Sequence, residues 1–165
     1  MTVHPWSMLA IMLPAVVGLC VSPPRAVLAY NPTPSAPRGF YRLTDPKHLV
    51  TGDLVVSRLP ADVAALADLR RYIPSQVPVL KRIAATAGDV VCRRGAVVFI
   101  DGAQAGVALL RDHAGRPLPT WSGCQTLAAS QVFLLNPARL SFDGRYFGPT
   151  SRALILSKAT PLWTW

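Results

Sequence analysis

The chain has 165 residues, 51% of them hydrophobic and only 15% charged, so its length suits one domain with a short appendage and its composition excludes a disordered protein. The 17 basic residues outnumber the 8 acidic ones and give a net charge of +9, which suits contact with lipid headgroups or nucleic acid. The basic residues are spread along the chain, without a zinc-finger spacing, a phosphate loop or an RNP-type motif. We therefore expect no direct nucleic-acid partner.

The first element in the chain is an apolar segment. Residues 6–21 carry no charge and are followed by Ser-Pro-Pro, as in an export signal or a membrane anchor. About 16 helical residues span roughly 24 Å, which is short for a hydrocarbon core of about 30 Å. A signal peptide cleaved before Tyr30 is the alternative, because small residues precede that position, although the segment starts without a basic side chain. Both interpretations make residues 1–29 an apolar helix, a signal peptide or an anchor, and place residues 30–165 outside the cytoplasm.

The remainder of the chain is predicted to be mainly β. Only residues 61–72 have helical periodicity, with Val63, Leu66 and Leu69 on one face and Pro74 as the stop. Sixteen prolines and eleven glycines fit a loop-rich β architecture and leave little room for long helices. Runs rich in β-branched residues predict five strands, at residues 53–59, 77–84, 89–92, 96–100 and 131–135.

Two cysteines lie in this part of the chain. Cys92 and Cys124 are 32 positions apart, and a pair of cysteines in an oxidising compartment is expected to form a disulfide. Two buried free thiols are the alternative, because the sequence does not show the distance between them. The cysteine and histidine spacing matches no metal site, so we expect neither a metal nor a cofactor.

Ser35 is a candidate nucleophile. It lies in a segment with three prolines, residues 31–41, which would hold its backbone in an extended geometry. The alternative interpretation is that residues 31–41 are only a rigid spacer between the apolar segment and the domain. The three histidines have no nucleophile signature nearby, which argues against a Ser-His-Asp triad.

Lys81 is a candidate general base. Strand alternation puts it on the same face as Val79 and Ile83. Burial of a lysine lowers its pKa, and a neutral amine can then deprotonate a serine hydroxyl. An edge-strand lysine whose amine reaches water is the alternative interpretation.

Four segments resemble, in the same order, the sequence boxes of type I signal peptidases. They are Ser35-Ala36-Pro37, the Gly-Asp-Leu-Val-Val of residues 52–56, the lysine box at residues 81–89 and the C-terminal box at residues 141–148. The chain is most similar to the conjugative-transfer signal peptidases of the TraF type, through the pattern at residues 31–41, Ala-Gly-Arg-Pro-Leu-Pro at residues 114–119 and Trp-Thr-Trp at residues 163–165. The resemblance covers residues 30–165 and implies a signal-peptidase-like β-barrel or sandwich with one short helix.

The resemblance also implies site roles. Ser35 would be the nucleophile and Lys81 the general base, giving an acyl-enzyme. Thr33 would help to form the oxyanion hole with the backbone N–H of Ser35, and Ser141 would orient Lys81. Asp143 and Arg145 match an acidic and basic pair that lies near the site in the family, and the resemblance gives Asp143 a functional role. The alternative is that Asp143 is purely structural and forms an Asp-Gly turn paired to Arg145.

The departures from the housekeeping pattern favour the transfer branch. Ala36 stands where many housekeeping enzymes have methionine, Ala87 replaces a proline before Gly-Asp, and the chain has one apolar segment at its start. The resemblance thus implies a periplasmic serine peptidase at the inner membrane that processes the conjugative pilin precursor by removing a signal or C-terminal peptide, with cyclisation as a further step. Its expected partners are that precursor and the membrane surface. A housekeeping signal peptidase and a non-catalytic envelope component of the transfer apparatus are the alternatives.

Overall fold

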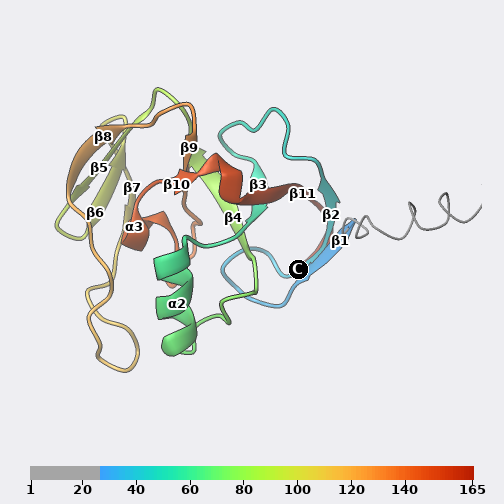
Figure 1. Cartoon of the computed structure of the whole chain (residues 1–165), viewed down its shortest axis with the longest axis horizontal. Helices are drawn as coiled ribbons and strands as arrows, with labels where there is room; N and C mark the ends of the chain where they lie inside the picture. The colour runs from blue at the N-terminus through green and yellow to red at the C-terminus, as the bar shows by residue number, and fades with distance from the viewer. Residues whose placement is uncertain (1–26) are drawn as a thin grey trace, which may run out of the picture.

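The computed structural model describes residues 27–165, which form two antiparallel sheets with a short helix packed beside them (Figure 1). The apolar segment at residues 6–21 lies outside the described residues, so the choice between an anchor and a signal peptide stays a prediction. From residue 27 to residue 165, no helix has the length and apolar character needed to cross a bilayer. The prediction of a mainly β fold is confirmed.

The larger sheet positions the candidate site residues of the first half of the chain. Lys81 lies on one of its strands, and Thr33 and Ser35 lie in the turn between two others. Its strand order is β1-β2-β11-β3-β4-β9-β10. The strands are β1 (Leu28–Asn31), β2 (Gly39–Thr44), β3 (Leu54–Ser57), β4 (Val79–Ala85), β9 (Gln131–Leu134), β10 (Thr150–Ser151) and β11 (Ile155–Thr164). The long C-terminal strand β11 lies between β2 and β3 and pairs with both. It thereby ties the end of the chain to its first described strands.

The smaller sheet lies at the opposite end of the molecule from β1 and β2 (Figure 1). Its order is β7-β6-β5-β8, with β5 (Val90–Arg94), β6 (Val97–Ile100), β7 (Ala103–Val107) and β8 (Gly123–Thr126). Cys92 on β5 and Cys124 on β8 are directly opposed and form a disulfide. The expected disulfide is therefore confirmed, and it closes the long connection between β5 and β8.

Helix α2 (Ala61–Leu69) confirms the predicted helix and the predicted burial of Val63, but not the predicted burial of Leu69. The buried residues are Val63, Ala64 and Ala67, whereas the side chain of Leu69 is 81% exposed. The helix ends at Leu69, before the turn in which Arg71 adopts a positive φ of 57°. Small alanines allow the helix to pack closely on the chain around β4, so the apolar positions with the largest side chains do not define the buried face.

All five predicted strands are present, as β3, β4, β5, β6 and β9. In β4, alternate residues from Val79 to Ala85 are buried, and the central core cluster includes Val55, Ile83, Val132 and Leu134. The alternation places Lys81 on the buried face, as predicted.

A second short helix, α3 (Gly144–Phe147), and the 3-10 turn η1 (Arg152–Leu154) complete the fold.

Removing the disulfide by the double change Cys92→Ala and Cys124→Ala is expected to lower the free energy of unfolding by about 3–4 kcal/mol. The reason is that cross-linking 32 residues apart restricts the unfolded chain. Urea denaturation of the oxidised wild type, the reduced wild type and the double variant measures the effect. The reduced wild type should match the variant, and equal midpoints for all three samples would contradict the expectation.

Candidate active site

The turn that carries Ser35 is built around the side chain of Asn31, at the end of β1. Asn31 Nδ2 donates to the carbonyl oxygens of Thr33, Ala36 and Pro37 at 3.0–3.1 Å. Asn31 Oδ1 accepts from the backbone N–H of Thr33 at 3.1 Å and from its hydroxyl at 2.8 Å. One buried amide therefore fixes the backbone on both sides of Ser35. Asn31 was not among the site residues predicted from the sequence, although it begins the pattern at residues 31–41.

Ser35 lies in this turn rather than in the extended segment that the neighbouring prolines predicted. Its Oγ is 3.1 Å from Thr33 Oγ1. Because Thr33 donates its hydroxyl proton to Asn31 Oδ1, Ser35 is the donor in this contact. The backbone N–H of Ser35 has no hydrogen-bond partner among residues 27–165 and can therefore donate a hydrogen bond to a bound substrate. The extended prediction was wrong because Asn31 supplies hydrogen bonds that favour a turn.

Lys81 is buried on β4, with only 2% of the residue exposed. Its Nζ donates to Ser141 Oγ at 2.7 Å. Burial lowers the pKa of Lys81 from 10.5 to about 8; Asp143 acts in the opposite direction, and Arg145 adds to the lowering. The structure therefore excludes the interpretation of Lys81 as an edge-strand lysine whose amine reaches water. Because its pKa is lowered to about 8, the Lys81 amine loses its proton near physiological pH more readily than an exposed lysine does.

Three polar residues act on the buried Lys81 amine: Ser141 through a hydrogen bond, and Asp143 and Arg145 through their charges. Asp143 is fully buried and caps α3, and its carboxylate accepts from Arg145 Nε at 2.8 Å and Arg145 Nη2 at 3.2 Å. Gly144 lies so close to β9 that a Cβ there would be 2.7 Å from the carbonyl oxygen of Leu134. The only side-chain hydrogen bond of the Lys81 amine among the described residues goes to Ser141, so Asp143 acts on Lys81 through its charge and not through contact.

Asn136, which was not predicted from the sequence, joins β4 to the Asp143 and Arg145 ion pair. Its side chain accepts from the backbone N–H of Arg82 at 2.8 Å and donates to the carbonyl oxygen of Leu80 at 3.1 Å. Its own backbone N–H donates to Asp143 at 3.1 Å, and its carbonyl oxygen accepts from Arg145 at 2.6 Å. Asn136 thus holds the two residues that flank Lys81. No local sequence signal marks it, because its side-chain partners lie 54 and 56 positions away.

Replacing Asn136 by alanine is expected to lower the free energy of unfolding by about 1–3 kcal/mol for each of the two backbone groups left without a partner. Chemical denaturation measures the loss. Gln131→Ala is the matched control, because it removes an amide from the start of β9, the strand that precedes Asn136, where the side chain bonds only to the neighbouring turn. Similar small losses in both variants would show that Asn136 does not hold β4.

Ser35 and Lys81 lie where two cavities meet. The small cavity, of about 210 Å³, lies between β1 and the start of β4, and the large cavity, of about 590 Å³, lies beside the segment that precedes α3. Both are lined by Thr33, Ser35, Ile73 and Lys81. The structure therefore brings the predicted nucleophile and the predicted base to one site, although no hydrogen bond joins the two side chains among residues 27–165.

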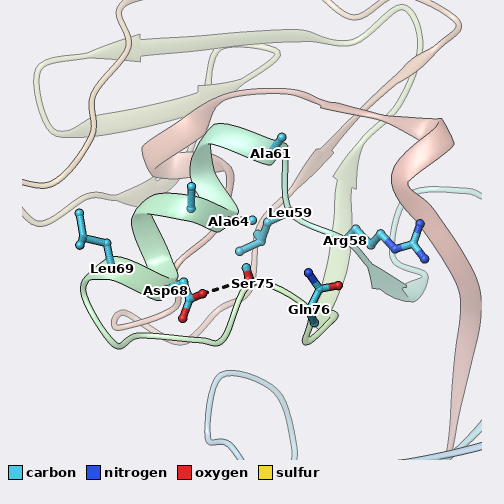
Figure 2. Close-up of a pocket in the computed structure, with 9 residues that line it drawn as sticks. Arg58, Leu59, Ala61, Ala64, Asp68, Leu69, Ser75 and Gln76 are labelled. Atoms are coloured by element: carbon cyan, nitrogen blue, oxygen red, sulfur yellow. Dashed lines mark hydrogen bonds between the residues drawn. The ribbon is translucent and has the colours of Figure 1, made fainter.

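A third hollow lies along α2 and holds none of the predicted site residues. Figure 2 shows its lining, with Ser75 Oγ donating to Asp68 at 3.0 Å and Leu69 pointing outward from the helix. No residue that lines it also lines the two cavities beside Ser35. The candidate chemistry is therefore confined to the site between β1, β4 and α3.

Comparison with known proteins identifies the class to which this arrangement belongs. The family model of the signal peptidases, peptidase S26, matches residues 1–165, and the chain belongs to this family. It is 34% identical over 167 residues to a probable conjugal transfer protein TraF of Sinorhizobium fredii (strain NBRC 101917 / NGR234), covering 95% of this chain and 88% of that protein. It is also 32% identical over 147 residues to a plasmid transfer protein TraF of Escherichia coli, covering 82% of each.

Among solved structures, a signal peptidase I from Enterococcus faecalis V583 matches with a TM-score of 0.41 and 18% identity, covering 69% of this chain and 98% of that one. The family match and the TraF relatives confirm the predicted resemblance to TraF-type members of the signal peptidase family.

Proposed function

We propose that the protein is a serine endopeptidase of a conjugative transfer system, with Ser35 as the nucleophile and Lys81 as the general base. The observation that carries the proposal is the buried Lys81 amine, with a pKa lowered to about 8, at the cavity junction that Ser35 also lines. A lysine tuned in this way is suited to proton transfer near neutral pH. Membership of the S26 family and the TraF relatives support the same assignment.

The bond changes and proton transfers use the Ser35 and Lys81 side chains and water. Neutral Lys81 takes the hydroxyl proton of Ser35 as Ser35 Oγ bonds to the scissile carbonyl carbon. The tetrahedral intermediate collapses, the peptide C–N bond breaks, and the Lys81 ammonium gives its proton to the leaving amine. Water then attacks the ester, with Lys81 again as the base, and releases Ser35. An amine from the same substrate in place of water would join its two ends into a ring.

The oxyanion of the intermediate needs donors near Ser35. The free backbone N–H of Ser35 is one, and we assign the Thr33 hydroxyl as the second. In the structure this hydroxyl donates to Asn31 Oδ1, so it must turn toward the substrate as the reaction begins. Asn31 keeps the turn closed during this change, because it also holds three backbone carbonyls.

The acyl side of the substrate would lie in the small cavity. β1 is the edge strand of the large sheet, and β4 pairs with β9 only from Ile83 onward, so the cavity runs along strand edges on both sides. An extended peptide can pair with such edges. The cavity volume of about 210 Å³ favours small side chains next to the scissile bond.

We further propose that the protein works at the periplasmic face of the inner membrane. Tyr30, Phe40, Trp163 and Trp165 are exposed on the edge formed by β1, β2 and the end of β11, and their rings contact one another. Exposed aromatic side chains of this kind favour the bilayer interface. For the chain from residue 27 onward, which leaves out the apolar segment, vesicle cosedimentation should weaken when Trp163→Ser is combined with Trp165→Ser, and unchanged cosedimentation would contradict this placement.

Residues 1–29 are proposed to remain attached as the anchor. Strand β1 includes Leu28 and Ala29, and Ala29 lines the small cavity. Cleavage before Tyr30 would therefore remove half of β1 and part of the substrate site. Intact mass of the membrane-bound protein tests this directly, with the mass of the full chain as the expected result and a chain that begins at Tyr30 as the contradicting one.

The proposed substrate is the pilin precursor of the same transfer system. Co-expression of that precursor with the wild type or with Ser35→Ala, followed by intact mass of the pilin, tests this. Processing by the wild type alone is expected, and a product one water lighter than the linear form would show cyclisation. Cleavage of many unrelated exported precursors would favour a housekeeping peptidase, and unchanged processing with Ser35→Ala would favour a non-catalytic role in assembly.

A further inference from the structure

The large cavity is more than the space needed to expose Ser35 and Lys81. Its volume of about 590 Å³ lies within the range of about 300–1,000 Å³ typical of ligand sites, whereas the small cavity, at about 210 Å³, lies below it. Its lining is mostly apolar, with Leu109, Leu118 and Leu140 among the residues. Such a pocket suits a bulky apolar side chain.

One side of the large cavity is a fixed aromatic cluster. The ring of Phe142 stacks on Tyr146 with centroids 5.5 Å apart, and Tyr72 meets Phe142 edge-on at 5.4 Å. Tyr146 is also bonded through its hydroxyl to the backbone N–H of Leu109 at 3.2 Å. These rings offer a preformed apolar surface next to Ser141, the partner of Lys81.

Another part of the lining is the loop of residues 110–118, which is held in place by hydrogen bonds within the loop and to Tyr72. Leu118 N–H donates to the carbonyl of Leu110 at 3.0 Å. Asp112 accepts from Arg116 Nε at 2.7 Å and from the hydroxyl of Tyr72. Burial alone would raise the pKa of Asp112, but the hydrogen bonds from Tyr72 and Arg116 hold it well below its usual range. The loop is therefore anchored to the chain that follows α2, and the pocket exists before a substrate binds.

We propose that the large cavity is a leaving-side subsite, which binds a bulky apolar side chain of the polypeptide segment released by cleavage. This inference rests on the proposed function, because it takes Ser35 as the point of attack. A peptide whose acyl side lies in the small cavity crosses Ser35 and continues into the large cavity, since the two cavities meet at Ser35 and Lys81. Small residues before the scissile bond and a bulky apolar residue after it would then define the cleavage site.

Quenched fluorescent peptides test the subsite. Each peptide carries alanine on the acyl side and has phenylalanine or alanine at one of the first three leaving-side positions. At one position, the wild type is expected to cleave the phenylalanine peptide with a kcat/KM about 10- to 200-fold above that of the alanine peptide. Leu118→Trp and Leu140→Trp should bring this ratio close to one. Leu140 lies at the rim of the large cavity and is 82% exposed, so its replacement should not disturb the packing of the core.

Leu69→Trp is the matched control, because it makes the same change at an exposed leucine outside the cavity. It should keep the wild-type ratio. Cleavage without a leaving-side preference, or a preference that Leu118→Trp and Leu140→Trp both leave intact, would overturn the subsite while the peptidase assignment stands. Failure of the wild type to cleave any peptide or any exported precursor would overturn both.

Discussion

Replacing Ser35 by alanine, or Lys81 by methionine, is expected to reduce kcat for precursor cleavage by on the order of 10⁴- to 10⁶-fold, the range found when a nucleophile or its base is removed. In the proposed mechanism the two residues act in one proton transfer, so the double variant should lose no more activity than either single variant. Cleavage kinetics on the precursor measure the loss. Additive losses in the double variant would show that the two side chains act in separate steps.

The pH dependence of the wild type follows from the lowered pKa of Lys81. Because the neutral amine is the base in the proposed mechanism, kcat/KM should rise with pH through about 8. A rate that is flat across this range would contradict a lysine base. Ser35→Cys keeps a nucleophile at the same position. Its pH profile of kcat/KM should show the ionisation of the thiol in addition to that of Lys81.

The same residue affects stability in a defined direction. The pKa of Lys81 falls from 10.5 to about 8 on folding, so the unfolded state binds more protons between these pH values and wild-type stability rises with pH across them. Below about pH 8 the burial of the ammonium opposes folding by up to about 3 kcal/mol. Lys81→Met should therefore be more stable than the wild type at neutral pH, and this advantage should disappear above about pH 10.5.

Replacing Asp143 by asparagine is expected to destabilise the protein by about 3–5 kcal/mol, because it leaves the buried Arg145 guanidinium without its counter-ion. Asp143→Asn should also shift the kinetic pKa of Lys81 downward, since the Asp143 carboxylate favours the ammonium form. Arg145→Met should shift it upward for the opposite reason. Thermal unfolding and pH profiles of kcat/KM measure the two effects separately.

The opposite signs distinguish an electrostatic role from a purely structural one. A double variant, Asp143→Asn with Arg145→Met, removes both charges and should lose less stability than the sum of the single variants. Its kinetic pKa should return toward that of the wild type. Shifts of the same sign in both single variants would show that the ion pair acts on Lys81 only by holding α3 in place.

Strand periodicity explains why part of this site could be predicted. Lys81 lies two residues from Val79 and from Ile83, so the period of two in β4 places it among them in the core. The strands rich in β-branched residues were predictable for the same reason. β7 and β8 were missed because nearly all of their residues are exposed. β11 was missed because Pro161 interrupts it at a register shift.

The residues that the sequence did not reveal act through distant backbone groups. Asn136 bonds to residues on β4 that are more than fifty positions away, and Asn31 is recognisable only once the turn around Ser35 is formed. The buried face of α2 was predicted only in part, because Ala64 and Ala67 meet the core beside Val63 whereas Leu69 is exposed. Such roles depend on tertiary proximity, which composition and periodicity do not encode.

Trapping the acyl-enzyme tests the central claim most directly. Wild-type protein is mixed with the pilin precursor, quenched in acid at successive times, and examined by intact mass and peptide mapping. We expect an ester on Ser35 whose rate of formation rises with pH through about 8 and which is absent from Lys81→Met. An adduct on another residue, or one that forms on Ser35 at an equal rate in Lys81→Met, would contradict the assignment of Ser35 and Lys81 as nucleophile and base.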